Sequence, residues 1–177
     1  MNSRFEDIIE LGNPILRKVS RKISFPIHKN IRELINSLMQ LVGKNEWMGF
    51  SAPQVGKSKR IFIIASHPNE IYPNAPKVEP FVVINPKFLE KSDEKLQEWE
   101  GCVSIPGIRG LVSRSKEIYV QYQDKDGDTV KREMSGFLAR IFQHEYDHLK
   151  GKLFLDRVTT LDNLMSEKEY RKRILNS

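Results

Sequence analysis

The sequence has only one cysteine, Cys102, among its 177 residues, so no disulfide can form within the chain. It lacks any apolar run near the roughly 20 residues that cross a bilayer, which excludes a membrane-spanning helix. Its first residues include acidic side chains and no apolar stretch typical of a signal peptide. No internal repeat or low-complexity linker is visible. We therefore expect one cytoplasmic domain over residues 1–177, with no membrane partner.

Charge of one sign is in excess only near the N-terminus. The net charge is +6, and residues 1–60 hold eleven Lys or Arg against five Asp or Glu. Residues 61–177 hold eighteen of each kind. The densest basic cluster, residues 17–22, has no interleaved aromatic side chains of the kind that stack on single-stranded nucleic acid. We interpret this cluster as a solvated basic face.

Hydrophobic patterning predicts strands followed by helices, without strict alternation. The expected helices cover residues 30–42, 136–150 and 161–175, and the expected strands cover residues 60–66, 81–85, 117–123 and 129–134. Pro86 should close the second strand, because proline cannot donate to a strand ladder. This order predicts an α+β fold with mainly antiparallel sheets around the helix at 136–150, and with a C-terminal helix.

The helix predicted over residues 136–150 contains His144-Glu145-Tyr146-Asp147-His148, an H-E-x-x-H pattern. Residues four apart lie on one face of a helix, so both imidazoles can point at one metal ion. The glutamate beside the first histidine then lies where it can take a proton from a metal-bound water. The pattern predicts a hydrolytic metal site with His144 and His148 as ligands and Glu145 as general base.

The residues by themselves leave the third metal ligand open. A metzincin is excluded, because Phe154 occupies the place of its third histidine. A thermolysin-like zinc peptidase takes a glutamate from a following helix, and Glu167 or Glu169 has suitable spacing. The thiol of Cys102 is the other choice, because its glycine-flanked segment allows close approach of the backbone. A Cys-His-His set with one open position is typical of a catalytic site.

Three segments together resemble the peptide deformylase family, which has the motifs G-x-G-x-A-A-x-Q, E-G-C-x-S and H-E-x-x-H in this order. Here they read Trp47-Met48-Gly49-Phe50-Ser51-Ala52-Pro53-Gln54, Glu100-Gly101-Cys102-Val103-Ser104 and His144 to His148. The second and third segments match fully. In the first, Trp47 replaces a glycine and Ser51 replaces an alanine, so we expect altered substrate contacts there.

The resemblance implies an enzyme that removes the N-formyl group from N-formylmethionyl nascent peptides and releases formate. It also implies that Cys102, His144 and His148 hold a divalent ion, physiologically Fe²⁺, for which Zn²⁺, Ni²⁺ or Co²⁺ can substitute. A metal-bound water would attack the formyl carbon.

By the same resemblance, Glu145 would take the proton of that water and deliver it to the leaving amine. The amide of Gln54 and the backbone N–H of Val103 would stabilise the developing oxyanion.

Substrate-binding residues are expected on both sides of the metal. Phe137 and Ile141 lie seven and three residues before His144, so they share its helix face and can line an apolar pocket for methionine. The backbone of Met48 and Gly49 can hydrogen-bond a substrate held as an added strand. The resemblance adds Arg109 as a contact to the peptide chain.

Charged residues around the site have supporting roles in this interpretation. Matching family positions suggest an ion pair between Glu100 and Arg114 that braces the metal loop. Arg140, four residues before His144, can pair with Glu98 or Glu100.

The basic end of the predicted C-terminal helix resembles the ribosome-docking tail of the family, with ribosomal RNA as its anionic partner. We expect a monomer. A noncatalytic relative that binds the ribosome is a further alternative, for which Trp47 is the only indication.

Overall fold

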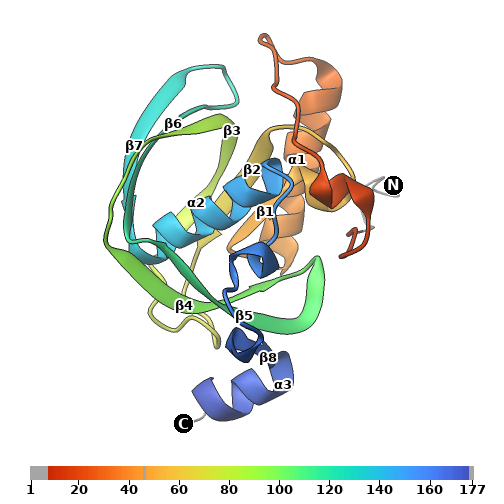
Figure 1. Ribbon diagram of the computed structural model, residues 1–177. Coiled ribbons are helices and arrows are strands. Elements are labelled where there is room, and N and C mark those ends of the chain that lie inside the picture. Colours follow the sequence, from red (N-terminus) through yellow and green to blue (C-terminus); the bar gives the residue numbers. More distant parts are fainter. Residues whose placement is uncertain (1–7, 46, 176–177) are drawn as a thin grey trace.

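The structure is a computed structural model that describes residues 8–45 and 47–175. One helix, α2 (Gly136–Leu149), runs between two antiparallel sheets (Figure 1). It contacts β1, β2, β6 and β7 of a five-stranded sheet and β5 of a three-stranded sheet, all defined below. The predicted α+β architecture around this helix is confirmed.

The larger sheet has the strand order β1-β2-β3-β6-β7, and every neighbouring pair is antiparallel. Its strands are β1 (Gly49–Ser51), β2 (Ile61–Ser66), β3 (Val78–Lys91), β6 (Glu117–Gln123) and β7 (Thr129–Ser135). Helix α1 (Lys29–Asn45) packs against β1, β2 and β3.

Strand β2 is buried along its whole length because both of its faces are covered. Ile61 and Ile63 belong to the core cluster that contains α1, whereas Phe62 and Ile64 pack with Phe142 of α2. Alternate side chains of a strand point to opposite faces, so this one strand anchors both helices to the sheet. Helix α2 is thereby held at a defined position.

The smaller sheet has the order β4-β5-β8. Strand β4 (Lys95–Cys102) pairs with β5 (Ile105–Ser115) in a hairpin in which Cys102 lies opposite Ile105. Strand β8 (Leu164–Ser166) adds to the other edge of β5. The chain also has short 3-10 turns, which cover Pro14–Arg17, Ala52–Val55, Phe154–Arg157 and Leu161–Asn163.

The expected end of a strand at Pro86 is wrong, because β3 continues to Lys91. Its pairing with β6 shifts register between Ile84 and Lys87, and Asn85 has a positive φ of 50°. A bulge of this kind accommodates proline within a sheet. The Asn85 side chain stabilises it by bonding the backbone N–H and C=O of Ile23 at 2.9 and 2.8 Å.

The helix predicted over residues 161–175 is correct only in its second half. Leu164–Ser166 is strand β8, because its backbone completes the edge of β5, and α3 (Glu167–Tyr170) begins after it. The Ser166 hydroxyl accepts a hydrogen bond from the Glu169 N–H at 3.2 Å and caps the helix start. A π-helical turn, Arg171–Leu175, follows.

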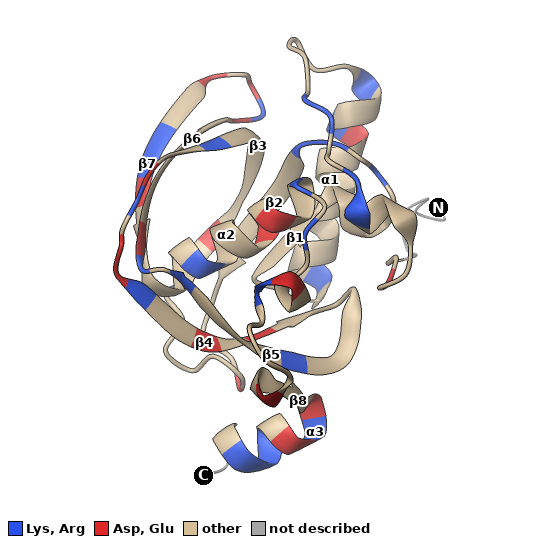
Figure 2. Cartoon of the chain, in the orientation of Figure 1, with Lys and Arg blue, Asp and Glu red and all other residues tan. Residues whose placement is uncertain are grey.

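Charges of both signs are spread over the molecule, and α3 with its following turn carries both (Figure 2). The basic side chains of residues 17–22 are exposed, and Arg17 pairs with Asp156. In the ranges that the structure describes, no helix combines the length and apolarity needed to cross a bilayer.

Candidate active site

Two elements bring the predicted metal ligands together. Helix α2 carries His144 and His148 on one face, with their ring centroids 5.1 Å apart. The last residue of β4, Cys102, places its Sγ 3.4 Å from Nε2 of His148. One ligand atom from each of the three residues lies within 4.8 Å of the other two.

A buried carboxylate orients the first histidine. Glu100, only 4% exposed, lies 3.0 Å from Nδ1 of His144, which leaves Nε2 of that ring for the cluster. Both oxygens of Glu100 accept from Arg114, at 2.6 and 2.8 Å, so the expected ion pair is confirmed. Arg140 bonds both Glu98 and Glu100 at 2.7 Å, so both of its expected partners are present.

This network also includes Asp147, which the sequence analysis did not single out. Asp147 accepts from Arg114 at 2.7 Å and from Arg157 at 2.6 Å. Burial alone would raise the pKa of Glu100, but the charge and hydrogen bonds of Arg114 and the bond to His144 hold it well below its usual range. The carboxylate of Glu100 is therefore ionised and fixed in position beside His144.

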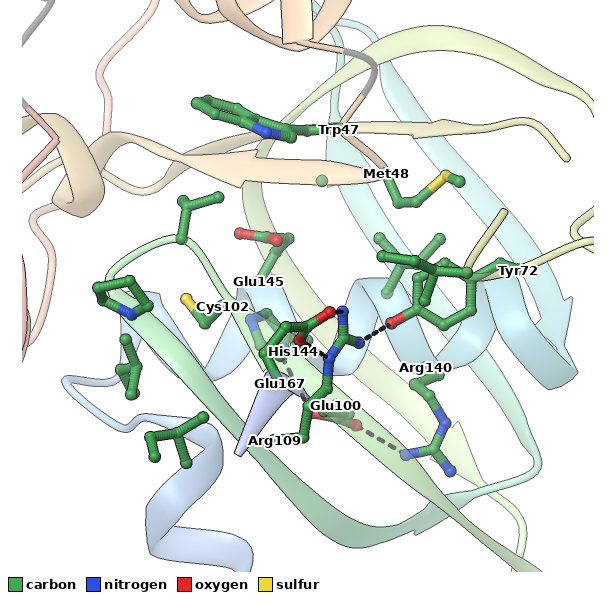
Figure 3. Close-up of a pocket in the computed structure, with 18 of the residues that line it drawn as sticks. Trp47, Met48, Tyr72, Glu100, Cys102, Arg109, Arg140, His144, Glu145 and Glu167 are labelled. Carbon is green, nitrogen blue, oxygen red and sulfur yellow. Dashed lines mark hydrogen bonds and ion pairs between the residues drawn. The ribbon is translucent and has the colours of Figure 1, made fainter. Parts of the chain in front are cut away.

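Glu145 is 3% exposed and lines a cavity that Cys102 and His144 also line (Figure 3). Its Oε2 is buried and has no hydrogen-bond partner within the part of the chain that the structure describes. Burial raises the pKa of the Glu145 carboxyl to about 7, which suits a group that must both take and release a proton. A Cβ on Gly49 would lie 2.6 Å from Oε1 of Glu145, so only glycine allows β1 to pass this close.

The amide of Gln54 has a fixed orientation. Its Oε1 accepts from the backbone N–H and from the hydroxyl of Ser51, both at 2.8 Å. The Nε2 group must then face the other way, and it lies 3.5 Å from Sγ of Cys102. Ser51, the second departure from the family motif, is fully buried and helps to aim this amide at the site.

These residues surround one end of a cavity of about 500 Å³. Every predicted catalytic and substrate-binding residue lines it, together with two of the predicted ligands: Met48, Gly49, Gln54, Cys102, Val103, Arg109, Phe137, Ile141, His144 and Glu145. Three lining residues that were not expected, Asn69, Ile71 and Tyr72, belong to the connection between β2 and β3. No motif marks this connection, and its place is known only from the fold.

Trp47, the first departure from the family motif, also lines the cavity. Asn85 is the only residue other than glycine with a positive φ in the ranges described, so Trp47 needs no glycine-like backbone. Its ring packs on Phe50 with centroids 4.8 Å apart. The tryptophan therefore adds an aromatic side chain to the wall of the cavity.

The alternative third ligands are wrong. Glu167 lines the cavity, but its carboxylate pairs with Arg109 at 2.6 Å. Among the described residues, the ligand atoms gathered with those of His144 and His148 belong to Cys102, and not to Glu167 or Glu169.

The chemistry of the donor set fits a divalent metal ion. One sulfur and two imidazole nitrogens are ligands preferred by zinc and iron, and three protein ligands leave a position for water or substrate. Burial and the neighbouring His144 lower the pKa of His148 well below its usual value, which keeps that ring in the neutral form that binds a metal.

Comparison with known proteins gives a consistent result. The sequence profile of the polypeptide deformylase family matches residues 5–164. Peptide deformylase 2 of a Nostoc species is 46% identical over 174 residues, 98% of this chain and 97% of the relative. The peptide deformylase of Thermotoga maritima is 35% identical and covers 89% of this chain and 90% of its own. A class I type b peptide deformylase from Acinetobacter baumannii, solved with Met-Ala-Ser bound, has a TM-score of 0.83 and 37% identity, over 86% of this chain and 97% of that one.

The fold and the site together define a metal-dependent hydrolase. The family profile and the relatives show further that the chain belongs to the polypeptide deformylase family. It is an enzyme that removes the N-formyl group from newly synthesised polypeptides. A thermolysin-like peptidase and a noncatalytic ribosome-binding relative are thereby set aside.

Proposed function

We propose that Cys102, His144 and His148 are the metal ligands of this deformylase, and that Glu145 is its general base and acid. The observation that carries the proposal is the meeting of one thiol, two imidazoles and a buried carboxylate at one end of the substrate-sized cavity. A divalent cation held by this set would lower the pKa of a water to about 7, which would supply hydroxide at neutral pH.

Fe²⁺ is the native ion in this proposal, with Zn²⁺, Ni²⁺ or Co²⁺ able to replace it. Imidazole ligands suit all four metals, and a single thiolate beside an open position supports a reactive rather than a structural site. A thiolate beside Fe²⁺ is also a target of oxidation, which provides a way to test the assignment.

The protein groups around the open position divide the work of the reaction. Glu145 accepts a proton and later delivers it to the leaving amine. Nε2 of Gln54 and the backbone N–H of Val103 donate to the oxyanion that develops on the formyl oxygen. The orientation of Gln54, fixed by two hydrogen bonds from Ser51, supports its role because a preorganised donor needs no rearrangement during the reaction.

The rest of the cavity binds the peptide. Phe137 and Ile141 form the apolar side of the methionine pocket. The backbone of Met48 and Gly49, at the edge strand of the larger sheet, pairs with the substrate as an added strand. Arg109 contacts the peptide beyond its first residue.

We further propose that the enzyme acts in the cytoplasm on N-formylmethionyl nascent chains, as a monomer of one domain. Contact with the ribosome would use the basic residues 171–173 of the C-terminal turn. Glu167 and Glu169 in the first turn of α3 reduce the net positive charge of the C-terminal segment. The proposed contact is therefore limited to the π-helical turn that follows α3.

The test combines formate release from formyl-Met-Ala-Ser with elemental analysis after anaerobic purification. Cys102→Ser should lose both the metal and the activity, whereas Glu167→Gln should keep the metal. If Cys102→Ser retains its metal, the ligand assignment is wrong. Activity that disappears in air and returns with Ni²⁺ or Zn²⁺ would support iron as the native ion.

A further inference from the structure

Arg109, Tyr72 and Glu167 line a part of the cavity that we call its outer half, and Arg109 is buried there rather than free on the surface. It is 6% exposed and lies opposite Gly101 in the pairing of β4 with β5. A Cβ on Gly101 would lie 3.1 Å from Cζ and Nε of Arg109, so the guanidinium lies directly against the backbone next to Cys102. It also lies over the ring of Tyr170, with Cζ 4.8 Å from the ring centroid.

The partners of this guanidinium come from two distant segments. Its Nε donates to Oε2 of Glu167 at 2.6 Å and its Nη2 to Oε1 at 3.4 Å, so the carboxylate faces the guanidinium with both oxygens. Its Nη1 donates to the hydroxyl of Tyr72 at 2.9 Å, and the Tyr72 ring packs on Phe137 with centroids 4.7 Å apart (Figure 3).

Glu167 has one further cationic partner. Nε of Arg171 donates to its Oε1 at 3.2 Å, and Nη1 of Arg171 bonds Glu70 at 3.1 Å. Burial alone would raise the pKa of Glu167, but hydrogen bonding and the charge of Arg109 lower it below its usual value. The carboxylate is therefore ionised at neutral pH and opposes the charge of Arg109.

This pairing decides the charge that a substrate meets in the outer cavity. A guanidinium without an acidic partner would attract any carboxylate of the peptide, either an acidic side chain or the C-terminus of a short chain. Glu167 also lines the cavity and supplies that carboxylate from the protein itself. The other arginine of the cavity, Arg140, is likewise paired with Glu98 and Glu100.

We propose that Glu167 is a specificity-determining residue that neutralises Arg109, so that the outer cavity does not favour formylated peptides with a carboxylate beyond their second residue. The proposal rests on the function proposed above, in which Arg109 faces the bound peptide. It assigns α3 a role in substrate selection through its contact with β5.

The experiment compares kcat/KM for two amidated peptides, formyl-Met-Ala-Asp and formyl-Met-Ala-Asn, which differ only in one charge. The wild-type enzyme should process them at similar rates. In Glu167→Gln the ratio of Asp to Asn peptide should rise by about twofold to fivefold, the range expected for one ion pair near a protein surface. The change should lie in KM, because the affected contact is remote from the formyl group.

Glu169→Gln is the matched control, because it removes the same charge from the same short helix outside the cavity lining. It should leave the ratio unchanged. In the double variant Arg109→Gln/Glu167→Gln the rise in the ratio of Asp to Asn peptide should disappear. A rise that persists would be due to Arg171, the other partner of Glu167, and would contradict the proposal. Since each ratio compares two substrates on one preparation, partial loss of folded enzyme cancels.

The proposal is overturned if the ratio in Glu167→Gln stays at its wild-type value, or if Glu169→Gln shifts it equally. These outcomes are distinct from failure of the proposed function. If the proposed function failed, the wild-type enzyme would release no formate from either peptide.

Discussion

The inner and outer halves of the cavity are built in different ways. The inner half consists of the Cys102, His144 and His148 cluster with the buried Glu100 and Arg114 behind it, and its polar groups bond to one another. The outer half is made by single side chains from separate segments, joined by ion pairs that reach the surface at Arg171 and Glu70. In the proposed mechanism, reactivity depends on a buried network of ion pairs, whereas selectivity depends on contacts that one substitution can exchange.

The largest effect on catalysis is expected in the inner half, from Glu145→Gln. Its kcat/KM for formyl-Met-Ala-Ser should fall by about 10² to 10⁴, the usual contribution of a general acid and base. Metal content should remain that of the wild type, because the carboxylate is not a proposed ligand. Full activity with bound metal would refute the assignment of Glu145.

The buried network should dominate the stability of the inner half. Arg114→Met leaves the carboxylates of Glu100 and Asp147 short of a cation, and we expect a loss of about 3–5 kcal/mol in the free energy of unfolding. Urea denaturation measures it. Lys116→Met, which breaks the exposed pair with Glu94, is the control and should cost under about 1 kcal/mol. Equal losses in both variants would mean that burial of the network does not matter.

Gln54→Ala should lower kcat by about 10² to 10³, corresponding to roughly 2.7–4 kcal/mol of barrier. Ser51→Ala removes one of the two hydrogen bonds that orient Gln54, so its kcat should fall by a smaller factor, about tenfold. Steady-state kinetics with a series of formyl peptides tests this order. A larger loss from Ser51→Ala than from Gln54→Ala would show that the serine does not act through the amide.

The smallest effect is expected from Trp47 in the cavity wall. Trp47→Ala removes an aromatic wall that packs on Phe50 and should raise KM by about threefold to tenfold, with kcat unchanged. Trp47→Phe should restore most of the affinity, because a ring is retained. A fall in kcat for Trp47→Ala would mean that the two halves of the cavity are coupled.

Prediction from sequence succeeded where the needed residues are close along the chain. The H-E-x-x-H segment lies within one helix, so helical geometry alone places His144 and His148 together. Prediction failed for β4 and β5, where charged, polar and glycine residues interrupt the apolar ones and leave no continuous apolar run. It also failed at Pro86, because the bulge depends on Asn85 bonding to Ile23, 62 residues away.

The sequence by itself determined helix α2 with its two histidines and its glutamate. Through three ordered motifs it also indicated Cys102 as the residue that lies beside the two histidines. These features depend on local helix geometry and on short contiguous segments. Only the tertiary structure decided that Glu167 pairs with Arg109, that Tyr72 lines the cavity and that Asp147 joins the buried network. Contacts between residues tens of positions apart are set by how sheets and helices pack, and neither periodicity nor spacing along the chain records that packing.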